Sequence, residues 1–175
     1  MKKRTRAREL TLQFLYQLDL RGDELYAEAN AYLRSEERDP ETLRFATRLI
    51  EGVWENWEEI ERTVQAVAQN WNIARMAVID RNVLRLGTFE LLHCPDIPPK
   101  VAVNEAIELG KRYSTANSGA FINGILDKIM NRKPATKPET AAERDELAAR
   151  VAPQPEGDAD VLPEGDEHPA AAQSG

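Results

Sequence analysis

The sequence predicts an all-α protein, and three observations support this fold class. Apolar residues recur at intervals of three and four over residues 1–133, the spacing that gathers them on one face of a helix. No stretch alternates apolar and polar residues over more than four residues, so strands are not expected. Proline and glycine separate the periodic segments. Counted between these breaks, the segments give a bundle of about seven helices.

Three helices are expected in the first part of the chain. The first ends at Gly22, and a weaker second helix covers about 24–36. The third begins at Asp39-Pro40-Glu41, because Asp caps helices, Pro fits the first helical position and Glu suits the positive helix end. The apolar residues of this third helix are Leu43, Ala46, Leu49, Ile50, Val53, Trp54 and Trp57.

Four more helices are expected before the end of the periodic region. The fourth carries an apolar stripe from Ile60 to Trp71, and the fifth covers 77–93. A proline-rich loop then precedes a sixth helix that reaches Tyr113. The last helix runs from Gly119 to Arg132. Its apolar face consists of Phe121, Ile122, Ile125, Leu126 and Ile129.

Charge divides the chain into two parts. The net charge is -7, yet residues 1–133 hold 20 basic and 20 acidic residues, whereas residues 134–175 hold 3 and 10. The second part also contains six prolines, ten alanines and no aromatic residue, so it cannot bury enough surface to order itself. We therefore expect a helical domain over 1–133 and a disordered acidic tail over 134–175. The tail is interpreted as a solubilising extension or as an acidic decoy against non-specific RNA binding.

Several classes of protein do not fit this composition. A single cysteine, Cys94, excludes disulfide scaffolds and multi-cysteine metal sites within one chain, and no apolar run is long enough for a membrane span. Without a secretory signal, a cytoplasmic location is expected. His93 lies next to Cys94, but neighbours on a helix point about 100° apart. Gly119 and Gly124 lack the Lys and Ser/Thr of a phosphate loop. No catalytic residue, metal or cofactor is expected.

The strongest functional signal is basic charge at the start of the first helix. Cations are unfavourable at this positive helix end unless an external anion binds there, and the phosphates of a nucleic acid are the obvious anion. A merely solubilising N-terminus is the alternative. At 100° per residue, Arg6 lies opposite Arg4, so we expect the residues before about Arg6 to be extended until RNA binds. The five cations among the first eight residues are Lys2, Lys3, Arg4, Arg6 and Arg8.

Four groups of residues carry a family resemblance. They are Arg6-Ala7-Arg8-Glu9 with Gln13 and Leu15-Tyr16-Gln17, Asp80-Arg81 with Leu84-Arg85-Leu86 and Glu90-Leu91, the stretch from Val101 to Leu109, and the stretch from Phe121 to Lys128. Together they resemble the NusB family of transcription antitermination factors over about 1–133. The resemblance implies two small helical bundles packed at a steep angle. It also implies a non-enzymatic protein that binds boxA RNA with NusE, a small-subunit ribosomal protein, in the RNA polymerase antitermination complex, and so supports processive transcription of ribosomal RNA.

The resemblance assigns roles to individual residues. It places RNA contacts at the basic N-terminal residues Lys2, Lys3, Arg4, Arg6 and Arg8, and at Lys100 and Phe121. It places NusE contacts at Tyr16 and Asp80. Glu105 lies one helical turn from Glu108, and we expect it at a solvated or partner-facing edge. Core packing is the alternative for Tyr16 and Phe121, and a first-turn acid that stabilises its own helix is the alternative for Asp80.

Three other functions are alternatives to RNA binding with NusE. NusB-like domains also precede RNA cytosine methyltransferases, but here a proline-rich segment follows the helices in place of a domain for a methyl donor. A homodimeric protein-binding scaffold is a further alternative, as is a ribosomal RNA maturation factor without boxA specificity. A salt series separates phosphate binding, which weakens as salt rises, from apolar self-association, which does not.

Overall fold

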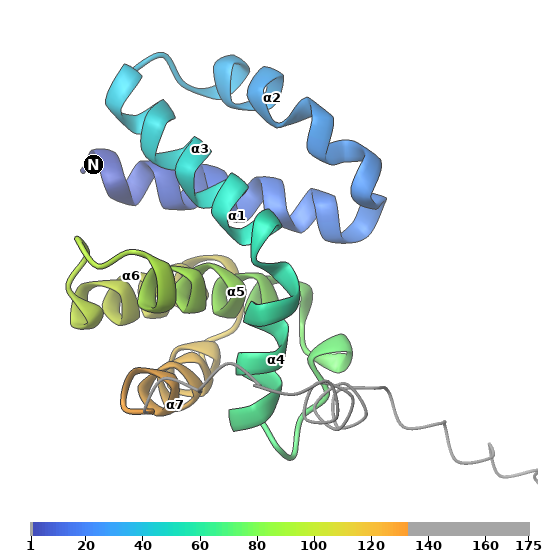
Figure 1. The fold of residues 1–175 in the computed structure, drawn as a ribbon, viewed down its shortest axis with the longest axis vertical. Coiled ribbons are helices and arrows are strands. Elements are labelled where there is room, and N and C mark those ends of the chain that lie inside the picture. The colour runs from blue at the N-terminus through green and yellow to red at the C-terminus, as the bar shows by residue number, and fades with distance from the viewer. Residues whose placement is uncertain (1, 133–175) are drawn as a thin grey trace, which may run out of the picture.

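The computed structural model describes residues 2–132, and the expected disordered tail 134–175 lies outside these described residues. Within them the chain forms seven α-helices and two short 3-10 helices, η1 and η2, without a strand (Figure 1). The prediction of an all-α fold with seven helices is therefore confirmed. The elements are α1 (Lys3–Arg21), η1 (Asp23–Glu28), α2 (Ala29–Glu36), α3 (Pro40–Glu55), α4 (Trp57–Val67), η2 (Ile73–Arg75), α5 (Val78–His93), α6 (Pro99–Tyr113) and α7 (Ser118–Met130).

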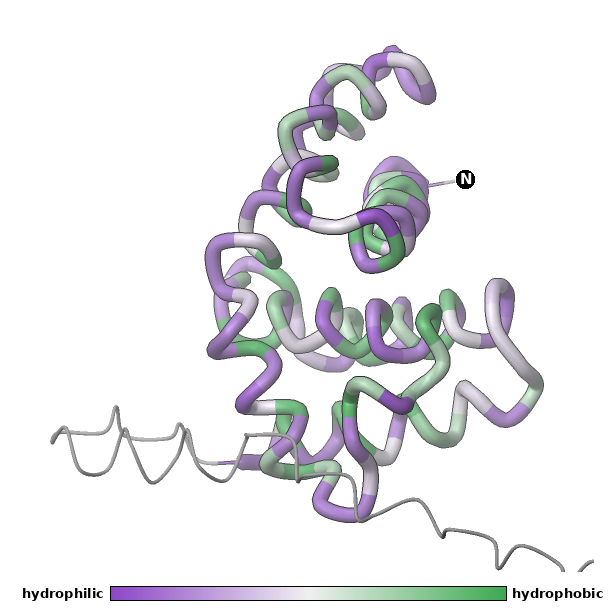
Figure 2. Tube along the Cα trace, turned by 90° about the vertical axis from the view of Figure 1, so that its right-hand side faces the viewer, coloured by the Kyte–Doolittle hydropathy of each residue, from purple (hydrophilic) through white to green (hydrophobic). Residues whose placement is uncertain are grey.

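The helices form two bundles that meet at α5. Helices α1, α2 and α3 pack together in the upper part of Figure 1, and α4, α5, α6 and α7 pack together below them. Helix α5 contacts α1 and α3 as well as its own bundle, so it lies at the centre of the molecule. Hydrophobic and hydrophilic positions alternate along the helices (Figure 2). None of the helices in the part of the chain that the structure describes is long and apolar enough to cross a membrane.

The expected second helix is divided into two pieces. Gly22 ends α1 with a φ of 99°, a conformation that glycine adopts at little cost. The chain then makes the 3-10 helix η1 before α2 begins. The tighter turn brings the Tyr26 ring onto Trp54, with ring centroids 4.4 Å apart and the planes nearly parallel. Packing between η1 and α3 therefore overrides a continuous helix here.

The boundary between α3 and α4 differs from the expected one, which placed Trp57 in the third helix. Helix α3 ends at Glu55, and the Asn56 side chain donates a hydrogen bond of 2.8 Å to the carbonyl of Gly52. This side-chain hydrogen bond competes with helix continuation, as is usual for asparagine. Trp57 instead begins α4, where the guanidinium of Arg85 lies over its ring at 4.2 Å.

The fourth helix is shorter than predicted. Helix α4 ends at Val67, and Trp71 lies in the following loop with 60% of its surface exposed. The side chain of Gln65 holds this loop, because its amide group donates to the carbonyls of Ala68 and Trp71 at 3.2 and 2.7 Å. Its oxygen also accepts from the backbone N–H of Ile73 at 3.1 Å. The prediction that Trp71 belongs to an apolar helical stripe is therefore wrong.

An ion network holds α1 against α4 and α5. The carboxylate of Asp19 in α1 accepts hydrogen bonds from Arg81 at 2.6 and 2.7 Å and from Arg85 at 2.8 Å. Arg85 also donates to Glu61 in α4 at 2.6 Å. Burial raises the pKa of Asp19, but the hydrogen bonds from Arg81 and Arg85 outweigh burial and leave the pKa below its usual value. The network therefore fixes the C-terminal half of α1 on the second bundle.

Close packing of α3 on α5 gives the first testable prediction. A Cβ atom on Gly52 would overlap the buried ring of Phe89, so we expect Gly52→Ala to lower the free energy of unfolding by about 1–3 kcal/mol. Gly124→Ala is the matched control, because a Cβ atom there meets nothing within 4 Å. The control should leave stability unchanged or raise it by up to about 1 kcal/mol. Urea denaturation measures both, and equal stabilities of the two variants would contradict the packing described.

Candidate nucleic-acid interface

The basic start of α1 is helical. Helix α1 begins at Lys3, and the backbone N–H of Arg6 donates to the carbonyl of Lys2 at 3.0 Å. The prediction that residues before Arg6 are extended in the free protein is therefore wrong. No acidic residue lies in the first turn of α1, and no side chain caps it. Acids from other elements supply the compensating charge.

Two of the N-terminal cations pair with acids around the start of α3. The ammonium group of Lys3 lies 3.1 Å from a carboxylate oxygen of Asp39 and 3.0 Å from one of Glu41. Arg6, one turn after Lys3, lies 3.7 Å from Glu37. Asp39 accepts hydrogen bonds from the backbone and side chain of Thr42 as the predicted helix cap, and these bonds lower its pKa to about 2. The surface at the start of α1 is thus basic but largely paired.

Arg8 is the exception among the N-terminal cations, because it is buried. Only 2% of its surface is exposed, and it donates two hydrogen bonds to one oxygen of Glu90, at 2.9 Å and 2.6 Å. A third nitrogen lies 3.9 Å from Glu105. Burial raises the pKa of Glu90, although the hydrogen bonds from Arg8 oppose this shift. The position of Arg8 corrects its expected role as an RNA contact, because a phosphate at the surface cannot reach this guanidinium.

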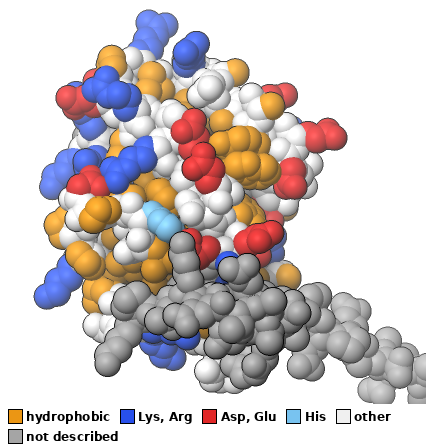
Figure 3. Space-filling view, in the orientation of Figure 1, with side chains coloured by type: hydrophobic (Ala, Val, Ile, Leu, Met, Phe, Trp, Pro, Cys, Tyr) orange, Lys and Arg blue, Asp and Glu red, His pale blue; other side chains and the backbone are white. Residues whose placement is uncertain are grey.

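Arg4 lies on the same side of α1 as Arg8 but remains at the surface. Its guanidinium lies over the Phe45 ring at 4.6 Å and 3.6 Å from a carboxylate oxygen of Asp96. Arg48 in α3 binds the same carboxylate with two hydrogen bonds of 3.0 and 2.6 Å. Lys and Arg side chains gather on the side of the molecule where α1 begins (Figure 3).

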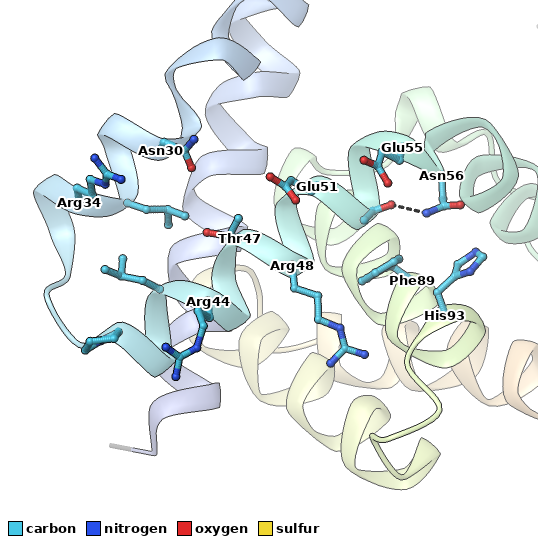
Figure 4. A pocket seen from close by; sticks show the side chains of 14 residues that line it. Asn30, Arg34, Arg44, Thr47, Arg48, Glu51, Glu55, Asn56, Phe89 and His93 are labelled. Carbon is cyan, nitrogen blue, oxygen red and sulfur yellow. Dashed lines mark hydrogen bonds between the residues drawn. The ribbon is translucent and has the colours of Figure 1, made fainter.

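A groove of about 800 Å³ lies beside this basic edge, between α2, α3 and α5 (Figure 4). Arg34, Arg44 and Arg48 line one part of it, and Phe89 and His93 from α5 line another. Within residues 2–132, neither Arg34 nor Arg44 has a carboxylate within ion-pair distance. The groove therefore extends the basic edge of α1 with cations that sequence reasoning did not identify.

Phe121 lies in the first turn of α7, half-buried, and packs edge-on against Trp71 with ring centroids 5.7 Å apart. Because Trp71 is well exposed, the two rings form an aromatic surface of the kind on which single-stranded bases stack. Sequence reasoning missed Trp71. Its polar neighbours Gln69, Asn70 and Asn72 were the signal that it lies outside an apolar stripe.

Lys100 is exposed in the first turn of α6, and the first half of α1 contacts the same helix through Thr5 and Glu9. The hydroxyl of Thr5 lies 3.2 Å from both carboxylate oxygens of Glu105, one turn further along α6. The structure thus brings Lys100 near the N-terminal cations. Phe121 follows the opposite end of α6, so a ligand that contacts both sites must span about 20 Å, the length of that helix.

The residues expected to contact a partner fall into two places. Tyr16 is 37% exposed, and the ion pair between Asp19 and Arg81 brings its part of α1 beside the start of α5, where Asp80 lies. One carboxylate oxygen of Asp80 is buried without a hydrogen-bond partner in the described residues. Leu20, one turn after Tyr16, is 57% exposed and was not predicted. Glu105 lies at the other end of α1, so the structure separates it from Tyr16 and Asp80.

The candidates for catalysis or phosphate binding lie at the end of α5, directly after it, and in α7. Cys94 is buried, and burial raises the pKa of its thiol. His93 lies 2.9 Å from Glu59 in α4. Gly119 and Gly124 both lie inside α7. In the part of the chain that the structure describes, no group of three or more His, Cys, Asp or Glu side chains is placed to hold a metal ion.

The helical part of the chain is similar to known proteins. Residues 5–131 match the NusB family. The transcription antitermination protein NusB of Myxococcus xanthus is 45% identical over 133 residues, which cover 74% of this chain and 95% of the relative. The structure of T. maritima NusB is 39% identical, with a TM-score of 0.65 over 73% of this chain and 89% of that one. A structure of antitermination factors NusB and NusE in complex with dsRNA is 28% identical, with a TM-score of 0.65 over 74% of this chain and 97% of that one.

These similarities cover the helical domain and agree with its fold. They define the class of the protein first, as a transcription antitermination factor and not an enzyme. More narrowly, the chain belongs to the NusB family. The family resemblance of the sequence motifs is therefore confirmed.

The buried pair of Arg8 and Glu90 gives a second prediction. Arg8→Met leaves a buried carboxylate without its cation, so the free energy of unfolding should fall by about 3–5 kcal/mol at neutral pH. The double variant Arg8→Met/Glu90→Met should recover much of this loss, because no charge stays buried. The difference in the free energy of unfolding between the two variants should become smaller as the pH falls. The pKa of Glu90 is raised, so its carboxylate takes up a proton more readily in the folded state than in the unfolded state. Urea denaturation at neutral and mildly acidic pH tests this, and equal stability of the two variants at neutral pH would refute the structural role.

Proposed function

We propose that this chain binds boxA-type single-stranded RNA as a heterodimer with NusE and so takes part in the RNA polymerase antitermination complex. In this function it supports processive transcription of ribosomal RNA in the cytoplasm. The observation that carries the proposal is the exposed basic edge at the start of α1, beside Lys100. The solved complex of NusB and NusE with dsRNA supports RNA and NusE as its partners.

The basic edge supplies the contacts to phosphate. Lys2, Lys3 and Arg4 are exposed, Arg6 is half-buried, and Lys100 is exposed on the adjacent helix. Guanidinium and ammonium groups bind phosphate oxygens regardless of base sequence, so these contacts give affinity more than discrimination. The acids that pair with Lys3 and Arg6 compete with RNA, because each phosphate must replace an existing ion pair. RNA affinity of the isolated protein should therefore be modest.

The aromatic surface of Trp71 and Phe121 supplies contacts to bases. Base stacking on aromatic rings needs unpaired nucleotides, which is consistent with a single-stranded target. The face of α1 with Tyr16 and Leu20, together with Asp80, is the proposed NusE contact, because it combines exposed apolar surface with a carboxylate. We place Glu105 with the basic edge, where it accepts from Thr5 and lies opposite Arg8.

A salt series tests the phosphate contacts. If Lys2, Lys3, Arg4, Arg6 and Lys100 each meet one phosphate, the logarithm of affinity for boxA-type RNA should fall with the logarithm of salt at a slope of roughly -3.5. Replacing Lys2, Lys3 and Arg4 by Gln should reduce the slope to about -1.4, because Arg6 and Lys100 remain. Arg21→Gln, at the other end of α1, is the control and should leave the slope unchanged. Fluorescence anisotropy with and without NusE measures these affinities. A wild-type slope near zero would point to the homodimeric scaffold instead.

The aromatic contacts give a separate prediction. Trp71→Ala should weaken binding of boxA-type RNA by about 1–3 kcal/mol for each base that stacks on the ring. The salt slope should not change, because the variant removes no cation. Leu20→Ala is the control: it also removes an exposed apolar side chain, but on the face that we assign to NusE. Wild-type affinity of Trp71→Ala for RNA would exclude Trp71 from the interface.

A further inference from the structure

The carboxylate of Asp96 lies where the basic edge of α1 meets the groove. Arg4 approaches it from α1 at 3.6 Å, and Arg48 approaches it from α3 with two hydrogen bonds of 3.0 and 2.6 Å. Asp96 is in the loop between α5 and α6, and no other acid contacts these two guanidinium groups in the described residues. Two arginines from different helices thus hold a single anionic group.

This arrangement is one that suits a phosphate group. A guanidinium binds the two oxygens of a phosphate in the same forked geometry that Arg48 uses for Asp96. The Phe45 ring beneath Arg4 holds that guanidinium in place, so little order would be lost when the anion is exchanged. Arg44, one turn before Arg48 on α3, lines the adjoining groove without a carboxylate partner in the described residues.

We propose that Asp96 occupies a phosphate-binding position in the free protein, and that a backbone phosphate of the bound RNA displaces it from Arg4 and Arg48. This inference rests on the proposed RNA-binding function and extends its footprint from α1 to α3. The strand then continues toward Arg44 along the part of the groove lined by arginines. Glu51 and Glu55 lie at the other part of the groove and limit how far a polyanion can follow it (Figure 4).

The exchange requires only a side-chain movement. The side chain of Asp96 is 45% exposed, and ion pairs at such a surface add little to stability. The neighbouring residues Cys94 and Ile97 are buried, so the loop backbone stays anchored when the carboxylate turns away. Asp96 therefore lowers the RNA affinity, and replacing it should change the free energy of unfolding little.

The sign of one substitution tests the proposal. Asp96→Asn removes the competing charge, so affinity for boxA-type RNA at low salt should rise by roughly three- to tenfold, the order of one charge-assisted surface contact. The salt slope should stay close to the wild-type value, because the same phosphate meets Arg4 and Arg48 in both proteins. Arg48→Gln should lower the affinity, because it removes one of the two guanidinium groups that hold this phosphate. Asp23→Asn removes one negative charge at the far end of α1 and should change affinity much less.

The outcomes separate this inference from the proposed function. If Asp96 instead positions the two arginines for RNA, Asp96→Asn weakens binding and the inference is overturned. It is also overturned if Asp96→Asn and Asp23→Asn change the RNA affinity by the same factor. The third contradicting result is that truncation after Arg132 abolishes the RNA affinity gained by Asp96→Asn, because the acidic tail would then be the group that competes with RNA. If the wild-type chain and every variant fail to bind RNA, the proposed function fails. An NMR titration with inorganic pyrophosphate then still tests the phosphate-binding position. A larger shift of the Arg48 Nε–H signal in Asp96→Asn than in the wild-type protein supports the inference, and equal shifts refute it.

Discussion

The buried pair of Arg8 and Glu90 is the interaction on which the candidate interface depends. It joins α1 to α5, and so joins the first bundle to the second, at a point where both side chains are nearly inaccessible to water. Removal of one partner leaves the other charge buried and unpaired, so moving α1 away from α5 is strongly unfavourable. The exposed cations just before Arg8 are therefore presented from a rigid helix beside α6.

Most of the remaining charge near the start of α1 is also paired, but at the surface. Lys3, Arg4 and Arg6 each lie within ion-pair distance of acids that come from other parts of the chain. This pairing explains how five cations can begin a helix despite the unfavourable dipole. It also explains why the domain has no excess positive charge while it keeps a local basic edge. In the function that we propose, RNA binding is an exchange of these carboxylates for phosphates.

The helices could be predicted from the sequence because apolar periodicity is a local property. The end of α3 at Glu55 and the end of α4 at Val67 could not, because the side chains of Asn56 and Gln65 form hydrogen bonds there that depend on the folded loop. Among the proposed site residues, the basic cluster follows from the sequence itself, and Phe121 follows from the family resemblance. The burial of Arg8 could not, since its partner Glu90 lies 82 residues away and any arginine in a basic run looks exposed.

The contrast between Arg4 and Arg8 shows why spacing alone does not assign a function. One helical turn separates them, and both guanidinium groups lie over the ring of Phe45. Arg8 meets a carboxylate in the interior and holds the bundles together, whereas Arg4 meets one on an exposed loop and stays exchangeable. The difference lies in the acid that each arginine finds, which only the tertiary structure decides. In this chain Arg8 therefore serves the fold, and Arg4 is the one that we propose for RNA.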